Sequence, residues 1–511
     1  MSTVQSVDYL AIAPPLVLAL AALAVLVGDA FGGSRHLRGL GALAGVLIAA
    51  AAEVVLAVDV VSSGTSRATF CVAGPPVSCS YVVDEFTVLF EVVMLLAGGV
   101  VLLMAHAEVR DTGLPAGEFG FLLLAALAGA LALVAARDLI TLVVCLEVVS
   151  LPLFALAALR RHDGRSSEAG LKMFLVSVIS TAVMLFGISL VYGVTGTMFL
   201  DRVASALREP GSLGGVAAVG VVLVLVGFGF KVSAVPFHFW APDTYQGAPI
   251  AVAAFLSVVS KAAGFAGLIL VLTIGFGPYA RVWGPLVAVL AAVTMTAGNL
   301  VAARQRTPMR LLAWSSIAQA GYMLAPLGAV GGTLGLAAAP ERRAALDELV
   351  AATVGYVAIY AVMNIGVFAV VSVVGWIGRL GGGTIDDYRG LARDHPVVAL
   401  LLAFFLACLA GLPPGLAGLF AKVIVFRGVV DAGYGWLAVV MAVNTVIGLY
   451  YDLAWASRLF GPRTEGATVH FGRIAVPVGA AILVSAVATV LMSVLPQLVL
   501  GIAPLGTTTG G

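Results

Sequence analysis

The sequence is poor in charged residues and contains almost no lysine. Of its 511 residues, 10 % are charged, 61 % are hydrophobic and four are lysines, and the mean hydropathy is +1.11. An ordinary soluble domain carries about 25 % charged residues, so this composition excludes that class. The formal net charge of +1 gives no electrostatic attraction to nucleic acid. The composition therefore predicts an all-α polytopic membrane protein in a lipid bilayer, with no nucleic-acid partner.

Motifs for redox and nucleotide chemistry are also missing. The sequence contains no GxGxxG after a strand, no CxxC and no pair of histidines in a haem-like setting. We therefore expect no cofactor and no metal in this chain. Cys145 and Cys408 fall inside apolar segments and are simplest to interpret as packing residues. Cys71 and Cys79 share one loop, where they could form a disulfide or remain free thiols.

Fourteen apolar segments are long enough to be considered as membrane spans. They lie near 9–27, 37–58, 83–105, 118–136, 138–159, 170–194, 214–245, 248–274, 280–303, 309–330, 348–377, 396–430, 435–460 and 473–500. We treat residues 1–511 as a single membrane domain.

Spans 7 and 12 are interrupted by proline. Span 7 contains Pro236 and Pro242, and span 12 contains Pro413, Pro414 and Gly415. Proline removes a backbone donor and breaks a helix, and irregular backbone is tolerated at membrane depth only inside protein or beside a water-filled cavity. Two breaks five spans apart predict two inverted five-helix repeats, over 118–275 and 280–460. Residues 9–117 would then form three N-terminal helices, and 473–500 a last helix.

Three of the four lysines lie within apolar runs. Lys231, Lys261 and Lys422 occupy such positions, whereas nearly all arginines lie in connecting segments. A charge near the centre of a membrane helix costs roughly 2.5–3.5 kcal/mol. Genome bias could explain why lysine is rare, but it does not explain where the remaining lysines lie. Lysine can release its proton when buried and arginine cannot, so the pattern favours proton transfer.

Acidic residues also fall within spans. Glu147 lies in mid-span, Glu53 and Glu91 lie in spans 2 and 3, and Asp452 lies near one end of span 13, where its side chain could snorkel. A buried carboxylate needs a cationic partner. Such a pair could serve as a proton relay, because protonating one member changes the charge preference of the other. The alternative, which the file of three lysines disfavours, is a static ion pair that fixes helix register.

Basic residues in the loops are distributed unequally. The loops after odd-numbered spans carry sixteen Lys and Arg residues, and the opposite loops carry eight. Under the positive-inside rule the first set is cytoplasmic. This predicts that both termini and the loop with Cys71 and Cys79 are extracytoplasmic.

Several of these segments resemble one family. The strings are CLEVVSLPLFAL, GLKMFLVSVISTAVMLFG, FKVSAVPFHFWAPDTYQGAP, SKAAGF, RLLAWSSIAQAGYML and GLPPGLAGLFAKVIVF. Together they are similar to the antiporter-like subunits of respiratory complex I, a proton-pumping NADH-quinone oxidoreductase, over roughly residues 85–460. The resemblance implies fourteen helices and a proton path through Glu147, Lys231, Lys261 and Lys422, with secondary candidates at Lys172, His238, Tyr322 and Asp452. It also implies a bacterial plasma membrane location and other membrane subunits as partners, with NADH, FMN, iron–sulfur clusters and quinone bound elsewhere in the complex.

More than one branch of this family, and more than one function, is compatible with the sequence. LEVVSLP, Lys422 and the chain length fit the subunit N branch. Subunit M and the subunits of multi-component sodium/proton antiporters remain alternatives. A stand-alone transporter of an organic solute would need a midplane cavity, for which His238, Trp240 and Tyr245 offer some polar groups. A purely structural subunit would not need buried charges.

Overall fold

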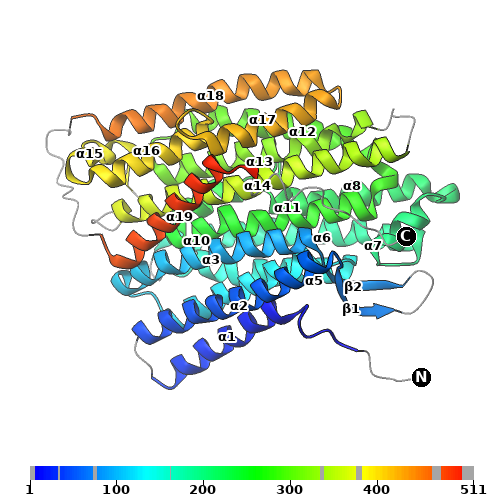
Figure 1. The fold of residues 1–511 in the computed structure, drawn as a ribbon, viewed down its shortest axis with the longest axis horizontal. Coiled ribbons are helices and arrows are strands. Elements are labelled where there is room, and N and C mark those ends of the chain that lie inside the picture. Colours follow the sequence, from blue (N-terminus) through cyan, green and yellow to red (C-terminus); the bar gives the residue numbers. More distant parts are fainter. Residues whose placement is uncertain are drawn as a thin grey trace.

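The computed structural model describes residues 6–32, 35–72, 77–160, 163–333, 339–375, 383–462 and 474–497, which fold into a bundle of helices (Figure 1). The helices are α1 (Ala13–Ala30), α2 (Arg35–Ser63), α3 (Glu85–Thr112), α4 (Ala116–Ala135), α5 (Leu139–Ala157), α6 (Gly164–Thr195), α7 (Leu200–Leu207), α8 (Gly214–Lys231), α9 (Trp240–Gly247), α10 (Ile250–Phe255), α11 (Lys261–Leu270), α12 (Ala280–Ala302), α13 (Pro308–Thr333), α14 (Ala339–Gly375), α15 (Leu391–Asp394), α16 (Pro396–Ala410), α17 (Leu416–Asp431), α18 (Gly435–Leu459) and α19 (Val476–Val494). Two π-helical turns, Leu256–Ser260 and Val271–Gly275, flank α11 and make one continuous helix with α10.

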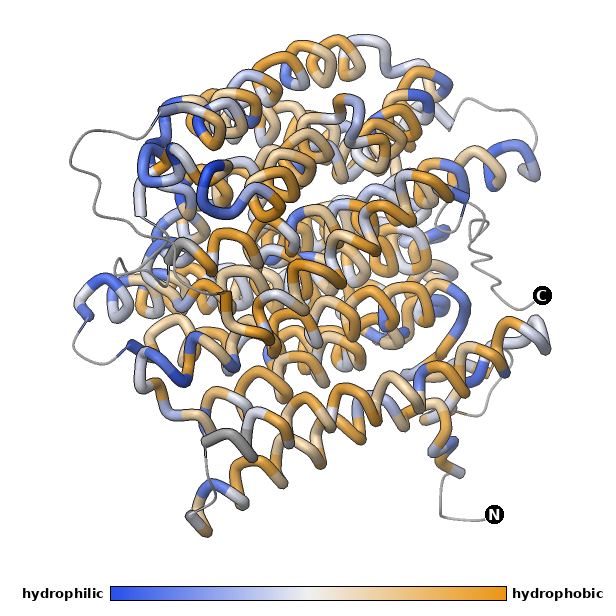
Figure 2. The backbone as a smooth tube through the Cα atoms, turned by 60° about the vertical axis from the view of Figure 1, so that its left-hand side comes forward, coloured by the Kyte–Doolittle hydropathy of each residue, from blue (hydrophilic) through white to orange (hydrophobic). Residues whose placement is uncertain are grey.

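Each of the fourteen predicted segments contains a helix. Within the described ranges, twelve helices are long and apolar enough to cross a membrane. The two other predicted segments are α13, which carries several polar residues, and span 12, which is divided into α16 and α17. Hydrophobic residues run along the middle of the helices and hydrophilic ones gather near their ends (Figure 2). The chain is therefore a multi-pass membrane protein, as predicted.

Aspartate side chains cap the starts of α3 and α5. The Asp84 carboxylate accepts a hydrogen bond from the Thr87 amide at the start of α3, and Asp138 accepts from the Ile140 and Thr141 amides at the start of α5. These side chains satisfy backbone donors that have no partner inside the helix.

One end of the bundle carries a β-hairpin. β1 (Arg67–Val72) and β2 (Ser78–Val83) pair antiparallel, and Cys71 lies opposite Cys79, to which it is joined by a disulfide. Arg67 binds Asp8 at 2.8 Å and Asp59 at 2.7 Å, so it ties the hairpin to the N-terminal segment and to α2. Partial burial alone would raise the pKa of Asp8. The hydrogen bonds from Arg67 and from the following backbone amides outweigh it and hold the pKa of Asp8 below its usual value.

Small residues bring α12 and α13 into close contact. A side chain at Gly298 would collide with the Ala318 backbone, and one at Gly321 with Met295. Lipid supplies little hydrophobic driving force between helices. Van der Waals contact between closely packed small residues therefore holds the two helices together. The close contact holds α13, which carries much of the site described below.

Candidate functional site

The first broken helix places Lys231 inside the bundle. Lys231 is the last residue of α8, and the chain continues irregularly until α9 begins at Trp240. The Trp240 indole donates to the Phe230 carbonyl at 3.2 Å, which also accepts from the Ser233 amide at 3.0 Å, so the start of α9 is tied to the end of α8. Lys231 is 3 % exposed, and its Nζ donates to Ser150 Oγ on α5 at 2.9 Å.

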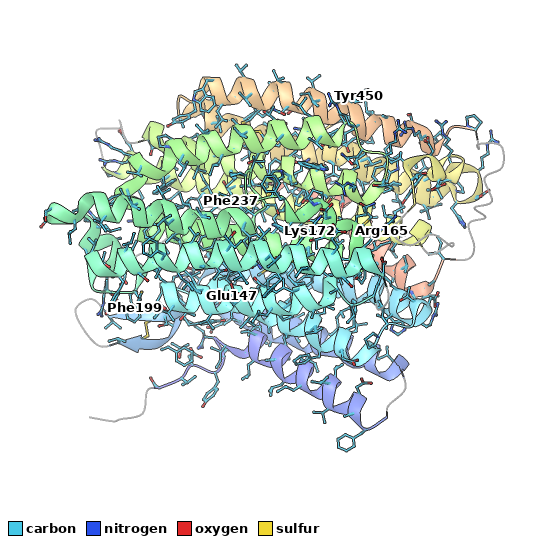
Figure 3. All side chains as sticks on the ribbon, turned by 180° about the vertical axis from the view of Figure 1, so that it is seen from behind. Glu147, Arg165, Lys172, Phe199, Phe237 and Tyr450 are labelled. Carbon is cyan, nitrogen blue, oxygen red and sulfur yellow. A yellow bond between two sulfur atoms is a disulfide. The ribbon has the colours of Figure 1, made fainter. Side chains whose placement is uncertain are left out.

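Glu147 lies one helical turn before Ser150 on α5. It is half-buried, and its carboxylate accepts a hydrogen bond from Thr181 Oγ1 on α6 at 2.7 Å. Figure 3 places Glu147 between the end of the bundle that carries Phe199 and the end that carries Arg165. Glu147 and Lys231 form no ion pair within 4.0 Å among the described contacts. The structure therefore places the Lys231 amine on the turn of α5 that follows Glu147, and each of the two groups is bound to a hydroxyl.

Lys261 lies at the centre of a hydroxyl cluster. It begins α11 directly after a π-helical turn and is 2 % exposed. Its Nζ donates to both the carbonyl and the hydroxyl of Ser316 on α13. The Tyr360 hydroxyl on α14 also donates to Ser316 Oγ, at 2.9 Å, and the Tyr360 ring lies 5.8 Å from Nζ. One serine therefore links three helices around this amine.

Lys422 occupies the second broken helix. It is 7 % exposed on α17, and its Nζ donates to the carbonyl of Ala410, the last residue of α16, at 2.6 Å. The Lys422 side chain thereby satisfies a carbonyl at the end of α16, where the helix stops. The Tyr322 ring of α13 lies 5.7 Å from Nζ.

Asp452 is the acidic neighbour of Lys422. It lies on α18, is 1 % exposed, and interacts electrostatically with Lys422. Its Oδ1 has no hydrogen-bond partner among the described residues. Snorkelling toward the membrane surface, which the sequence left open, is therefore wrong for Asp452, because the side chain points into protein.

Polar residues on α13 and α14 connect the two lysine clusters. Along α13, Ser316, Gln319 and Tyr322 follow at three-residue intervals. The Tyr356 hydroxyl on α14 donates to the Gln319 side-chain carbonyl, and its ring stacks on Tyr322 at 6.1 Å between centroids. The polar stripe therefore runs from the neighbourhood of Lys261 to that of Lys422.

The sequence analysis missed several members of this stripe. Tyr356, Tyr360 and Asn364 recur every four residues in the part of α14 that follows its charged N-terminal turns, and that spacing marks one helix face. It could have been recognised from the sequence. Ser150, Thr181 and Ser316 carried no comparable signal.

The three buried lysines share one electrostatic property. Each donates to a neutral oxygen, on Ser150, Ser316 or Ala410, and none makes an ion pair within 4.0 Å among the described residues. A buried ammonium without an ion pair is costly, whereas a neutral amine fits the same site. Lysine, unlike arginine, can adopt that neutral form by releasing its proton.

Lys172 and His238 make contacts of other kinds. Lys172 is 43 % exposed and binds Asp243 and Glu168, both at 2.6 Å, while Arg310 binds the same Asp243 at 2.8 Å. This bridge connects α6, α9 and α13. His238 lies within the first break, is 6 % exposed and packs its ring edge-on against Trp314 at 5.2 Å.

A buried ion pair anchors the helix that carries Lys261. Glu108 on α3 binds Arg160 at 2.9 Å and accepts hydrogen bonds from the amides of Ile250 and Ala251, which begin α10. A carboxylate at this position satisfies the free amides and the positive end of the helix. Glu108 is therefore a positioning residue that sequence reasoning missed.

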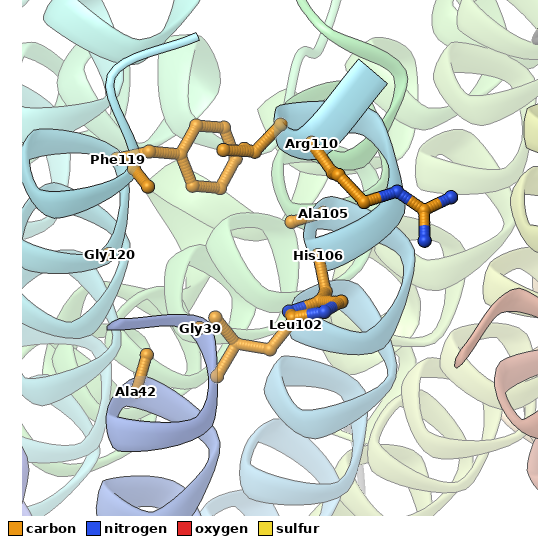
Figure 4. A pocket seen from close by; sticks show the side chains of 10 residues that line it. Gly39, Ala42, Leu102, Ala105, His106, Arg110, Phe119 and Gly120 are labelled. Atoms are coloured by element: carbon orange, nitrogen blue, oxygen red, sulfur yellow. The ribbon is translucent and has the colours of Figure 1, made fainter. Parts of the chain in front are cut away.

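A pocket of about 180 Å³ lies elsewhere, among the N-terminal helices (Figure 4). Gly39, Leu102, His106, Arg110 and Phe119 are among its lining residues. None of the pocket's lining residues belongs to either broken helix, so it does not supply the midplane cavity that a solute transporter would need.

Comparisons with known proteins identify the class. Residues 136–448 match the family model described as "NADH:quinone oxidoreductase/Mrp antiporter, TM". The fold is similar to a chain of respiratory complex I from Thermus thermophilus, with a TM-score of 0.76, 30 % identity, and coverage of 96 % of this chain and 98 % of that one. It also resembles a chain of the Mrp complex from Dietzia at a TM-score of 0.80 and 22 % identity, and the match covers 97 % of this chain and 96 % of that one. This likeness concerns the fold alone. The chain belongs to the family of antiporter-like membrane subunits that NADH:quinone oxidoreductases and Mrp antiporters share.

Its curated relatives narrow the assignment within that family. The NADH-quinone oxidoreductase subunit N 2 of Streptomyces griseus is 51 % identical, over 98 % of this chain and 94 % of the relative. The NADH-quinone oxidoreductase subunit N of Salinispora tropica is 44 % identical, over 90 % of this chain and 86 % of the relative. The predicted resemblance to the subunit N branch is confirmed.

Proposed function

We propose that this chain conducts protons through the membrane as subunit N of an NADH-quinone oxidoreductase. The observation that carries the proposal is the set of three buried lysines, each bound to a neutral oxygen, with hydroxyl-bearing side chains between them. A structural subunit would gain nothing from burying three amines without ion pairs, because each costs free energy. The subunit N names of its relatives support the same function.

The proposed relay begins at Glu147 and Lys231. Glu147 exchanges a proton with Lys231, at the first broken helix. Ser150 holds the Lys231 amine in place. Lys261 bridges the two halves through Ser316, Tyr360 and the stripe on α13 and α14. Lys422, with Asp452 beside it, serves the exit half. A proton arriving on Lys422 would be stabilised by an ionised Asp452 and released when Asp452 becomes protonated.

The wider setting is proposed from the family. The chain lies in a bacterial plasma membrane with both termini extracytoplasmic, and its repeats cover 118–275 and 280–460. Other membrane subunits of the complex bind it. NADH, FMN, iron–sulfur clusters and quinone are bound by partner subunits, and energy from NADH-to-quinone electron transfer drives the relay.

A comparison of two lysine substitutions tests the proposal. Lys261→Ala in the complete complex, reconstituted into vesicles, should reduce NADH-driven proton uptake strongly while the complex still assembles. Lys172→Ala removes a lysine from the exposed bridge and is the matched control, which should pump near the wild-type level. Equal pumping by both variants would show that burial of Lys261 has no role in transport.

A further inference from the structure

The N-terminal helices contain two buried carboxyl groups that the relay does not use. Glu53 on α2 is 1 % exposed and Glu91 on α3 is fully buried. Their carboxyl groups lie within hydrogen-bonding reach of each other. As carboxylates, their four oxygens have no hydrogen-bond partner among the described residues.

The pair lies on the opposite side of α5 from Glu147. Tyr81 on β2 lies near Glu53, Glu91 and Cys145, so Cys145 marks the face of α5 that is turned toward the pair. Cys145 and Glu147 are two residues apart, which is about 200° around a helix. Glu147 accordingly contacts Thr181 on α6. The two glutamates are therefore separate from the lysine axis.

No described cation is free to neutralise this pair. Arg137 is the nearby guanidinium, but it binds Asp84 at 2.7 Å and donates to the carbonyls of Val134 and Ala136. The other titratable groups near the pair are the Tyr81 hydroxyl and, beyond it, the Cys145 thiol. Of the remaining helices packed against α2 and α3, α10 and α19 carry no ionisable side chain, and α1 and α4 carry one each, at their far ends (Asp29, Glu118). α11 carries Lys261, which binds Ser316. α14 carries its acidic and basic residues within its first ten positions, and its tyrosines Tyr356 and Tyr360 bond to α13.

A shared proton would resolve this arrangement. An ionised carboxylate can only accept hydrogen bonds, so two of them facing each other have no donor and repel. One proton turns one carboxyl into a donor, creates a hydrogen bond between the two groups and leaves one negative charge instead of two. Tyr81 is 5 % exposed and its hydroxyl has no described partner, so it is available to donate to the remaining charge.

We propose that Glu53 and Glu91 form a second proton-binding site, in which the two carboxyl groups share one proton beside Tyr81. The site rests on burial and on the contacts within the N-terminal helices, and it does not depend on the relay proposed above.

Infrared difference spectroscopy of the complete complex at neutral pH tests this site. The wild-type spectrum minus that of the double variant Glu53→Gln/Glu91→Gln should contain the C=O band of one protonated carboxyl and the bands of one carboxylate. The C=O band should shift in deuterium oxide. Glu85→Gln, a half-buried glutamate in the first turn of the same helix, is the matched control and should remove carboxylate bands only.

Other spectra would overturn the proposal. Bands of two carboxylates would show that no proton is shared, and carboxylate bands that change when sodium replaces potassium would show a metal-cation site instead. Two protonated bands without a carboxylate would exclude sharing. If the double variant does not assemble, each single variant should change the frequency of the C=O band, because each removes one end of the shared hydrogen bond. A C=O band whose frequency is unchanged in either single variant would also overturn the proposal.

Discussion

Removing the Ser150 hydroxyl isolates the contact that holds Lys231. The Lys231 amine is 3 % exposed, and Ser150 Oγ is its described hydrogen-bond acceptor, at 2.9 Å. In Ser150→Ala the protonated amine would lose this acceptor at a buried position. The neutral amine would lose much less, because it is easier to bury.

The expected effect follows from the strength of this contact. A hydrogen bond to a charged group contributes about 1.5–3 kcal/mol. Each 1.36 kcal/mol is a factor of ten, so the protonated form of Lys231 should become roughly 10- to 150-fold less populated relative to the neutral form. If Glu147 and Lys231 exchange protons in every cycle, proton pumping should slow by up to that factor.

The assay is NADH-driven proton uptake by vesicles that contain the complete complex. Ser177→Ala is the matched control, because Ser177 is also buried but its hydroxyl has no hydrogen-bond partner among the described residues. Ser150→Thr keeps a hydroxyl and should restore much of the rate. Wild-type pumping by Ser150→Ala would refute the reasoning, since Lys231 would then need no hydroxyl.

Three further predictions concern other parts of the chain. Glu147→Gln and Lys231→Ala should each impair pumping, and the double variant should lose much less than the sum, because the two residues act as a unit; additive losses in the purified complex would contradict this. The folded pKa of Asp8 is held below its unfolded value, so its bond to the hairpin should stabilise the N-terminal segment at neutral pH and be lost as the pH falls through that lowered pKa. Hydrogen exchange should detect a loss of amide protection just before α1 at that point, relative to the intrinsic exchange rate at each pH, and protection that does not change with pH would contradict it. After reduction, a membrane-impermeant thiol reagent should label Cys71 and Cys79 from the extracytoplasmic face of intact cells, whereas labelling only from the cytoplasm would invert the topology.

The periodic and compositional features were predictable from the sequence. Apolar runs placed a helix in all fourteen segments, and prolines marked the two breaks, because both signals act locally along the chain. The burial of Lys231, Lys261 and Lys422 was also predictable, since each lies within an apolar run.

Contacts between distant segments were not predictable in the same way. The sequence suggested a direct Glu147–Lys231 pair, but the structure gives each of them its own hydroxyl partner, and no local pattern distinguishes Ser150 from other serines. Lys172 was a secondary candidate for the proton path, and nothing in the sequence indicated that it would form the exposed bridge with Asp243. Which face of α18 turns inward, and hence the burial of Asp452, depends on packing against other helices.

The most direct test of the proposed relay is the number of protons pumped per electron in Lys422→Arg. Arginine keeps the positive charge next to Asp452 but does not release its proton in proteins. Lys172→Arg makes the same exchange at an exposed position and should keep the wild-type ratio. The relay predicts that Lys422→Arg assembles and oxidises NADH but pumps fewer protons per electron. A wild-type ratio in Lys422→Arg would show that a fixed charge suffices at this position and would contradict proton transfer through Lys422.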